Sequence, residues 1–244
     1  MRLNEIAIED LSVSYGEKTA LSHVSTRFQR GEIYVLLGHN GAGKTTFIKE
    51  ILKADLKRQK IKYLTDEQNP RAKSLKYRMS FSPEKPVLFE ELTIMEYVSF
   101  VLKMYGSCRE QSLKRVKELL AAFDLEKEKN KFIYALSNGM KKKVCHIAAL
   151  ALDADFIFLD EPFAALDPVA IYELKRLILS RTEQAAIVLS THQLDVVEGL
   201  PVDPDRLHIR LLKQGRLLFE GTKGELLHEH PSLEAAYLHF YEAR

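Results

Sequence analysis

The pattern of apolar and polar residues predicts two kinds of β-strand in this chain. Residues Ile6 to Val13 and Val24 to Phe28 alternate apolar and polar side chains, which is typical of a half-exposed antiparallel sheet. Residues Ile33 to Leu37, Phe156 to Leu159 and Ala185 to Leu189 are almost wholly apolar, as in parallel strands buried on both faces. We therefore expect an N-terminal antiparallel β-subdomain beside a parallel core sheet.

A helical period of apolar residues covers much of the chain between the core strands Ile33 to Leu37 and Phe156 to Leu159. It runs through Leu92 to Tyr105 and Glu110 to Phe123, and it resumes over Lys141 to Leu152 after a break at Asn138-Gly139. We expect an inserted α-helical subdomain, approximately residues 88–153, within a single domain of residues 1–244. Further strands are predicted at Ile61–Thr65, Lys76–Ser82, Leu207–Leu212 and Arg216–Phe219, and further helices at Pro168–Ser180 and Leu233–Glu242.

Composition narrows the class of protein. The 244 residues are 46% hydrophobic and 29% charged, which is typical of a soluble globular protein with a sizeable core. Cys108 and Cys145 give neither a disulfide framework nor a metal-ligand spacing, so we expect a reducing, cytoplasmic setting. There is no signal-peptide pattern at Met1, and no apolar run is long enough to span a bilayer, so any membrane part is expected on another chain.

One loop between a buried strand and a helix fits the pattern G-x-x-x-x-G-K-[ST] of the phosphate-binding P-loop. The loop consists of Gly38, His39, Asn40, Gly41, Ala42, Gly43, Lys44, Thr45 and Thr46. Glycine lets backbone N–H groups close around phosphate oxygens, and the N-terminus of the following helix attracts the same anion. Lys44 is expected to reach the β- and γ-phosphates and the Thr45 hydroxyl to bind Mg²⁺. The loop predicts an α/β fold of the P-loop NTPase class.

Acidic residues follow the apolar strand Phe156 to Leu159, at the sheet edge where the P-loop is expected. Asp160 is placed to hold Mg²⁺, and Glu161 to polarise an attacking water as a general base. The simpler alternative is an acidic strand end that caps a helix. His192 ends the next core strand, where it could contact the γ-phosphate and orient the water, although a lone histidine is more often structural.

The segment Leu136-Ser137-Asn138-Gly139-Met140 carries a family resemblance. Here the chain resembles the nucleotide-binding subunit of an ABC transporter, in which L-S-G-G-Q opens a helix of the helical subdomain. The resemblance covers nearly the whole chain and implies a RecA-like core sheet, with ATP and Mg²⁺ as cofactors. It also implies that Ser137 and Gly139 bind the γ-phosphate of ATP held on a partner subunit's P-loop. Asn138 and Met140 depart from the family pattern, but Asn tolerates a left-handed turn and Ser137 suits a helix N-cap.

Other positions match the same family. Tyr15 resembles the aromatic residue that stacks on adenine, with a simple turn tyrosine as the alternative. Ala165-Leu166-Asp167 resembles the D-loop, which crosses the dimer interface. Glu84 stands where the family usually has glutamine, and the resemblance implies that it reaches the metal through water while adding negative charge. The Pro83–Thr93 stretch is similar to that of the ABC-2 exporter group.

The resemblance implies a catalytic role for Lys44, Glu161 and His192 in a dimer of identical or different nucleotide-binding subunits. Such a dimer drives a separate integral membrane permease, whose cytoplasmic helices meet the helical subdomain. We therefore expect a cytoplasmic protein held peripherally on the inner face of the cell membrane. Nucleic acid is not an expected partner, because the clusters Lys53 to Lys60 and Lys141 to Lys143 lack interleaved aromatics. We interpret these clusters as solvated helix faces, with contact to anionic lipid as the alternative.

Two other classes of protein remain as alternatives. A soluble ABC ATPase in assembly or repair has the same motifs, although this chain has one P-loop and no long coiled-coil insertion. A P-loop kinase or GTPase has the same phosphate loop, but the chain lacks the guanine-binding N-K-x-D motif. The Leu136–Met140 segment, Tyr15 and His192 also argue against that class.

Overall fold

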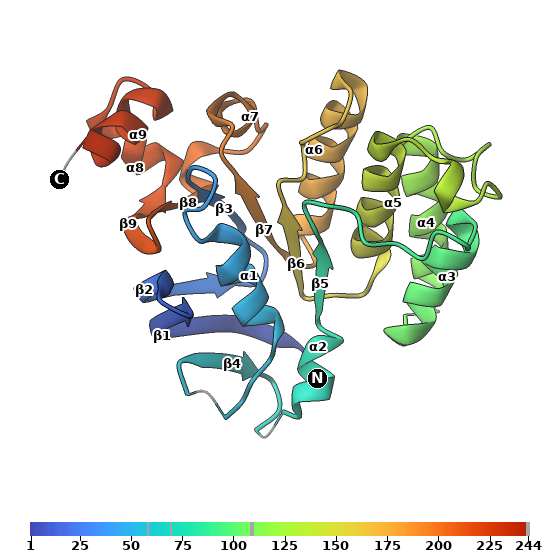
Figure 1. The fold of residues 1–244 in the computed structure, drawn as a ribbon, viewed down its shortest axis with the longest axis horizontal. Coiled ribbons are helices and arrows are strands. Elements are labelled where there is room, and N and C mark those ends of the chain that lie inside the picture. The colour runs from blue at the N-terminus through green and yellow to red at the C-terminus, as the bar shows by residue number, and fades with distance from the viewer. Residues whose placement is uncertain (58, 69, 108–109, 243–244) are drawn as a thin grey trace.

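A six-stranded sheet and a three-stranded sheet form the framework of the computed structural model, which describes residues 1–57, 59–68, 70–107 and 110–242 (Figure 1). The strand order of the larger sheet is β5-β6-β7-β3-β8-β9, parallel except for the antiparallel pair β8 and β9. Its strands are β3 (Ile33–Leu37), β5 (Met79–Ser82), β6 (Phe156–Asp160), β7 (Ala186–Thr191), β8 (Leu207–Lys213) and β9 (Arg216–Thr222). The predicted parallel core sheet is therefore confirmed.

The smaller sheet is the antiparallel N-terminal sheet that the alternating pattern predicted. Its order is β2-β1-β4, and β1 pairs antiparallel with both neighbours. The strands are β1 (Leu3–Tyr15), β2 (Lys18–Gln29) and β4 (Ile61–Thr65). Residues Gly16 and Glu17 join β1 to β2, with Tyr15 at the entrance of the turn.

Strand β3 lies between two hydrophobic cores. Ile33, Val35 and Leu37 pack in a core with the helices, whereas Tyr34 and Leu36 pack in a second core with the N-terminal sheet and α1. All five residues of β3 are buried, which explains the unbroken apolar run. The P-loop that follows β3 is thus anchored from both sides of the sheet.

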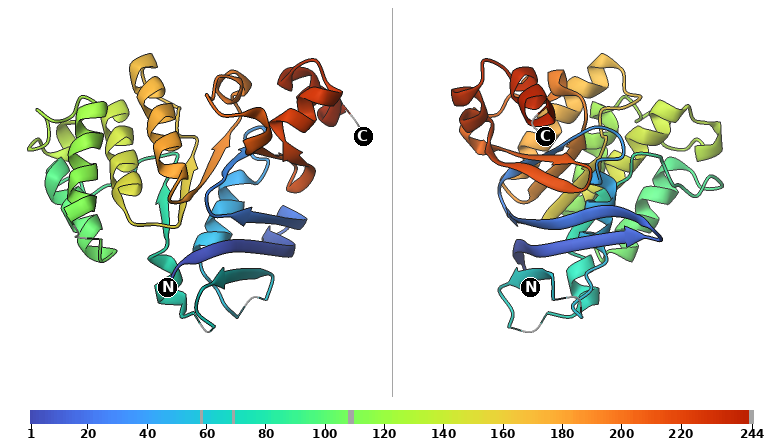
Figure 2. Two further views of the ribbon diagram at one scale, coloured as in Figure 1. Left: turned by 180° about the vertical axis from the view of Figure 1, so that it is seen from behind. Right: turned by 60° about the vertical axis from the view of Figure 1, so that its left-hand side comes forward.

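Helices α3, α4 and α5 pack together on the far side of the core sheet from the N-terminal sheet (Figures 1 and 2). The bounds are α1 (Lys44–Leu52), α2 (Ala72–Lys76), α3 (Ile94–Met104), α4 (Glu110–Ala122), α5 (Asn138–Ala151), α6 (Pro168–Thr182), α7 (Leu194–Glu198), α8 (Lys223–Glu229) and α9 (Leu233–Glu242). Among the described residues, no helix has the length and apolar character needed to cross a bilayer. The predicted bounds of a helical subdomain, residues 88–153, stay a prediction.

Two predicted boundaries are wrong. The strand expected from Lys76 begins only at Met79, because Ala72–Lys76 forms the short helix α2, which buries Leu75. Asn138 and Gly139 do not break a helix but begin one, because Ser137 caps α5 by accepting a hydrogen bond from the Met140 N–H at 3.3 Å. Asn138 has no positive φ, so the expected left-handed turn is not used.

Candidate ATP site

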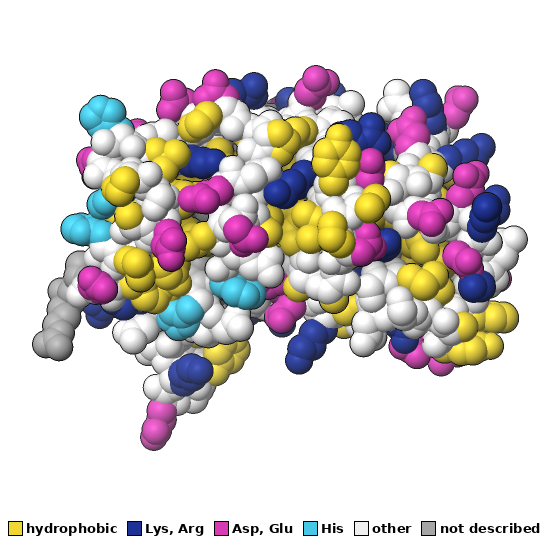
Figure 3. Space-filling view, turned by 90° about the horizontal axis from the view of Figure 1, so that it is seen from above, with side chains coloured by type: hydrophobic (Ala, Val, Ile, Leu, Met, Phe, Trp, Pro, Cys, Tyr) yellow, Lys and Arg dark blue, Asp and Glu magenta, His cyan; other side chains and the backbone are white. Residues whose placement is uncertain are grey.

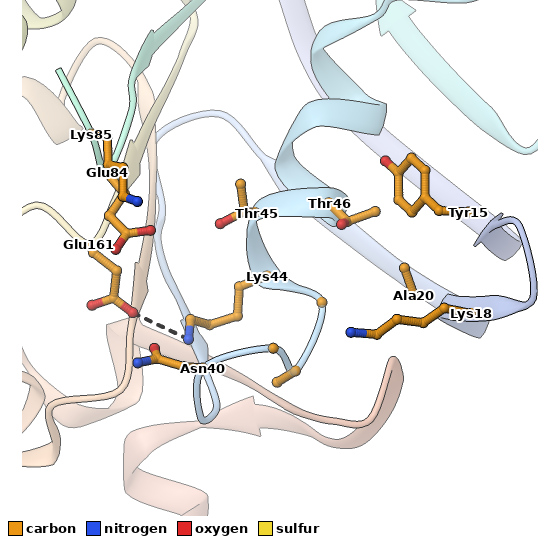
Figure 4. A pocket seen from close by; sticks show the side chains of 13 residues that line it. Tyr15, Lys18, Ala20, Asn40, Lys44, Thr45, Thr46, Glu84, Lys85 and Glu161 are labelled. Carbon is orange, nitrogen blue, oxygen red and sulfur yellow. Dashed lines mark ion pairs between the residues drawn. The ribbon is translucent and has the colours of Figure 1, made fainter. Parts of the chain in front are cut away.

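A cavity of about 460 Å³ lies between the P-loop, the β1–β2 turn and the loop after β5. It is lined by Tyr15, Lys18, Ala20, Asn40, Gly41, Ala42, Gly43, Lys44, Thr45, Thr46, Glu84, Lys85 and Glu161. Figure 4 shows Glu84 and Glu161 on one side of the cavity and Tyr15 on the other, with the P-loop between them. The cavity therefore has an acidic side beside the phosphate loop and an aromatic side away from it.

The glycines of the P-loop are required by its backbone. Gly41 and Gly43 have φ of 85° and 106°, values that other residues rarely adopt. A Cβ on Gly43 would lie 2.6 Å from the Ala20 carbonyl oxygen, and one on Gly38 would lie 2.4 Å from that of Leu212. Helix α1 begins at Lys44, so its first backbone N–H groups are available to an anion at the loop.

Lys44 is buried and is held by three oxygen atoms. Its Nζ donates to the carbonyl oxygens of Gly38 at 2.6 Å and His39 at 3.2 Å. It also pairs with Glu161 Oε1 at 3.2 Å. The ammonium group is thus positioned inside the loop, where phosphate oxygens can replace the carboxylate as its partner.

Thr45 and Asp160 meet at the carboxyl ends of the core strands. The Thr45 hydroxyl donates to Asp160 Oδ2 at 2.7 Å, and the Ser190 hydroxyl donates to the other carboxylate oxygen. A hydroxyl and a carboxylate are oxygen ligands of the kind that Mg²⁺ prefers, together with substrate phosphates. This pair of residues therefore fits a magnesium ion that is bound with a nucleotide.

Glu161 has its carboxylate between two cationic or ionisable partners. Its Oε1 lies 2.9 Å from His192 Nδ1 as well as 3.2 Å from Lys44 Nζ. Glu161 has a φ of +43°, a strained value for a residue with a side chain. Its N–H donates to the carbonyl and the hydroxyl of Ser190, at 3.1 and 3.0 Å, and these bonds hold the conformation.

Ser190 was not among the predicted site residues. Its single hydroxyl donates to Asp160 and accepts from the Glu161 N–H, so it orients both acids. One signal in the sequence could have identified Ser190, because this residue lies near the end of a core strand, directly before Thr191 and His192. Its hydrogen bonds depend on the register of β6 against β7, in which Asp160 is opposite Ser190.

Glu84 lines the cavity from the loop after β5, and its backbone is held by an unexpected residue. The Lys142 Nζ donates to the carbonyl oxygens of Pro83 at 2.8 Å, Glu84 at 2.9 Å and Asp160 at 3.1 Å. Lys142 is only 2% exposed, and burial lowers its pKa from 10.5 to about 8. The interpretation of Lys141 to Lys143 as a solvated face is therefore wrong.

The neighbours of Lys142 are also paired. Lys141 bonds to Glu90 at 2.6 Å and Lys143 to Asp167 at 2.9 Å. Lys53 to Lys60 is not a helix face either, since α1 ends at Leu52 and the described residues 53–57, 59 and 60 form turns and a loop. Cys145 is buried, whereas Cys108 lies outside the described residues.

Three predicted ligand residues lie at or beyond the rim of this cavity. Tyr15 is 57% exposed and lines the side away from the acids, which leaves its ring free to stack on a base. Ser137 and Gly139 do not line the cavity, and Ser137 is exposed at the start of α5. A Cβ on Gly139 would lie 2.9 Å from the Ala165 carbonyl oxygen, so this turn packs directly on the segment after β6.

His39 connects the P-loop to the C-terminal helix. Its N–H donates to the Tyr241 hydroxyl at 3.2 Å, and the two rings lie edge to face with centroids 5.6 Å apart. Lys213 donates to the Tyr241 carbonyl oxygen at 2.6 Å. Nothing in the local pattern of α9 indicated this contact, because it joins residues about two hundred positions apart in the sequence.

Comparisons with known proteins agree on one family. The family model described as "ABC transporter" matches residues 21–164. The chain is 32% identical over 238 residues to "ABC-type transporter ATP-binding protein EcsA" of Bacillus subtilis, covering 95% of this chain and 92% of that protein. It is 31% identical to "Bacitracin transport ATP-binding protein BcrA" of Bacillus licheniformis, covering 88% and 69%. A solved structure described as "Structure of ATP binding subunit of ABC transporter" has a TM-score of 0.84 at 31% identity, covering 97% and 99%.

Proposed function

The chain belongs to the ABC transporter family as an ATP-binding subunit with ABC-type ATPase machinery, and we propose that it hydrolyses Mg-ATP to drive a separate membrane permease. The observation that carries the proposal is the contact of Glu161 Oε1 with both Lys44 and His192, beside the Thr45–Asp160 pair. These residues supply a phosphate-binding cation, a base and a metal-binding pair at one sheet edge.

The bound nucleotide changes the partner of Lys44. Thr45 and Asp160 would hold Mg²⁺, which would neutralise part of the phosphate charge. Phosphate oxygens at the P-loop take over the Lys44 ammonium group from Glu161. The released carboxylate is then free to accept a proton from water, and His192 holds it in place from the other side. Glu84 lies on the same side as Glu161, where it adds negative charge next to the metal pair.

We infer that a second nucleotide-binding subunit, identical or different, completes the site. Ser137 lies outside its own chain's cavity but is exposed at the start of α5. Figure 3 looks down on the face above the core sheet, where charges of both signs are interspersed with hydrophobic side chains. Such a mixed surface suits an interface that opens and closes around ATP. Ser137 of each subunit would then contact the phosphate held by the other subunit's P-loop.

The permease is expected to bind beside the loop that carries Glu84. An apolar groove of about 170 Å³ lies there, lined by Phe81, Pro83, Val87, Tyr97, Val101, Tyr105, Cys145, Ala148, Ala149 and Leu152. Phe89 and Phe100, both exposed, lie edge to face near it, with centroids 5.5 Å apart. We propose that this groove receives a cytoplasmic amphipathic helix of the permease, which places the chain on the inner face of the cell membrane. BcrA is described as a bacitracin transport protein, and we propose that the permease of this chain is also of the exporter type.

The test of this function is the substitution Glu161→Gln. It removes the base but keeps the size of the side chain, so ATP hydrolysis should fall about 100-fold or more. It also removes the charge that holds Lys44, so ATP binding should persist and an ATP-bound dimer should accumulate in sedimentation experiments. Glu126→Gln, a matched change at an exposed residue, should leave both measurements unchanged. Unchanged steady-state hydrolysis in Glu161→Gln would refute the assignment of the base.

A further inference from the structure

A second cavity, of about 420 Å³, lies at the opposite edge of the core sheet, where β5 and β6 begin. It is lined by Arg2, Arg30, Arg78, Gln111, Arg115, Asp153, Ala154, Asp155, Arg181, Glu183 and Gln184. These residues come from the start of β1, the end of β2, helix α4, the α5–β6 loop and the end of α6. The ATP site uses none of them.

The lining carries an excess of positive charge. It has five arginines and three carboxylates, so two guanidinium charges remain in excess. Asp153 is engaged in an ion pair with Arg115. Asp155 accepts the Leu3 N–H at 2.8 Å, and Arg78 Nε lies 3.8 Å from the same oxygen.

Three of the arginines have no carboxylate within ion-pair distance among the described residues, namely Arg2, Arg30 and Arg181. Arg181 is only 7% exposed, and its guanidinium donates to two neutral oxygens, Gln184 Oε1 at 2.7 Å and the Leu152 carbonyl at 3.1 Å. Its buried Nε has no hydrogen-bond partner in the described part of the chain. Burial, and next the charge of Arg115, lower the pKa of Arg181 to about 10. A buried cation beside a second cation is stabilised by an added anion.

Three of the other arginines, Arg2, Arg30 and Arg78, share the cavity with the carboxyl group of Asp155. Burial raises the pKa of Asp155, and the Leu3 N–H bond and the charges of Arg78, Arg30 and Arg2 oppose this rise. Arg2, Arg30 and Arg78 all line the same opening as Asp155. Planar guanidinium groups bind phosphate oxygens in pairs, which makes arginine the usual residue for phosphate recognition.

We propose that this cavity binds a small anion with at least two phosphate-type charges, at a site separate from the ATP site. Its volume is in the range of small-ligand sites. The ligand would join α4, through Arg115, to the N-terminal sheet, through Arg2. It would also contact the α5–β6 loop, which connects the helix begun by Ser137 to the strand ended by Asp160. Occupancy is therefore expected to alter ATP turnover.

The test uses pyrophosphate as a probe, in the absence of magnesium, with the P-loop filled by ADP at one equivalent per chain so that no excess ADP competes for the arginine-lined cavity. Calorimetry should show one pyrophosphate bound per chain, with an affinity that falls as salt is added. Arg2→Gln and Arg30→Gln should each weaken binding about tenfold, since each removes charge-assisted hydrogen bonds. Arg2 is exposed and Arg30 is half-buried, and Arg30 loses only one hydrogen bond, to the Gln184 carbonyl oxygen at 3.4 Å, so both variants should stay folded.

Arg176→Gln is the matched control. This substitution also removes one arginine charge. Arg176 lies on α6, outside the cavity, and is paired with Glu173 at 2.7 Å. Its pyrophosphate affinity should equal that of the parent. The proposal is overturned by a lack of pyrophosphate binding to the ADP-loaded protein, or by equal weakening in Arg176→Gln and Arg30→Gln. Because the measurement involves no hydrolysis, its result is independent of the proposed function.

Discussion

At the scale of single residues, the buried ammonium group of Lys142 holds the backbone on the acidic side of the site. Three consecutive lysines look like one solvated patch, but a helix turns about 100° per residue and sends them to different surroundings. Lys141 and Lys143 reach acids at the surface, whereas Lys142 points inward to three backbone carbonyls. The position of those carbonyls depends on how the loop after β5 and the end of β6 are placed by the fold, which no local pattern contains.

Lys142→Met should reveal how much these contacts hold the acidic side of the site. The substitution leaves three carbonyl oxygens without their donor, so the free energy of unfolding should fall by about 3 kcal/mol. ATP hydrolysis should also fall, because the backbones of Glu84 and Asp160 lose a common anchor. Urea denaturation measures the first effect, and Lys114→Met, at a lysine side chain that is 77% exposed, is its control. A loss below about 1 kcal/mol would contradict the anchoring role.

At the scale of elements, the reliable predictions were those that rested on period and on caps. Ser137 suits an N-cap, but the break in the pattern at Asn138-Gly139 predicts a helix that begins only at Lys141, whereas α5 begins at Asn138. Gly139 suits the first turn of α5 because a Cβ at this position would lie only 2.9 Å from the Ala165 carbonyl oxygen. The short helix α2 was missed because five residues are too few to show a period.

His146 joins helix α5 to two neighbouring segments and gives a pH prediction. It is fully buried, with Nδ1 2.9 Å from Ser82 Oγ and Nε2 2.9 Å from the Pro162 carbonyl oxygen. Burial, and next the charge of Lys142, lower its pKa from 6.5 to about 3. The unfolded chain thus binds more protons than the folded one between pH 6.5 and 3, and the stability contributed by neutral His146 is lost as the pH falls through that range.

Denaturation curves at several pH values test this effect. The parent should lose up to roughly 1.4 kcal/mol per pH unit from this group below pH 6.5. His146→Gln retains a donor and an acceptor but does not titrate, so its stability should depend less on pH in the same range. The two proteins share all other acids, so parallel pH curves would show that His146 does not contribute.

The apolar groove beside α3 gives a prediction about permease binding. Phe89→Asp places a charge at the rim of the groove and should reduce co-purification of a permease from detergent-solubilised membranes about tenfold or more. The isolated chain should keep its ATP hydrolysis, because Phe89 does not line the ATP cavity. Leu238→Asp, at an exposed position on α9, is the control. Full retention of the permease by Phe89→Asp would mean that the partner binds elsewhere, and a fully active partner-free protein would favour a soluble ATPase.

At the scale of the whole molecule, the fold was predictable because local patterns and known connection rules agreed. Buried apolar strands separated by helices indicate a parallel sheet, and the P-loop fixed which sheet edge carries the chemistry. The contacts that cross that framework were not predictable. Three features depend on residues that only the tertiary structure brings together. They are the hydrogen bonds of Ser190 to both acids, the contact of Tyr241 with the P-loop, and the arginine-lined cavity.

Mixing two inactive variants tests whether the site is shared between subunits. Lys44→Ala removes the phosphate-binding cation of its own chain, and Ser137→Arg blocks the contact expected with the partner's ATP. Each variant alone should hydrolyse little ATP. If subunits exchange freely into symmetric dimers, an equal mixture should regain about one quarter of the parent activity, because half of the dimers contain one intact site. No recovery on mixing would indicate that Ser137 acts within its own chain or not at all.

The place of β3 between two cores also bears on how this protein melts. Neighbouring residues of one five-residue strand belong to different hydrophobic clusters, so neither cluster can come apart while the other keeps its full packing. The two halves of the molecule are therefore expected to share a single cooperative transition rather than unfold as independent units. A nucleotide bound at the end of β3 then protects the N-terminal sheet and the helices alike, and resistance to heat and proteases becomes a readout of nucleotide occupancy for the whole chain.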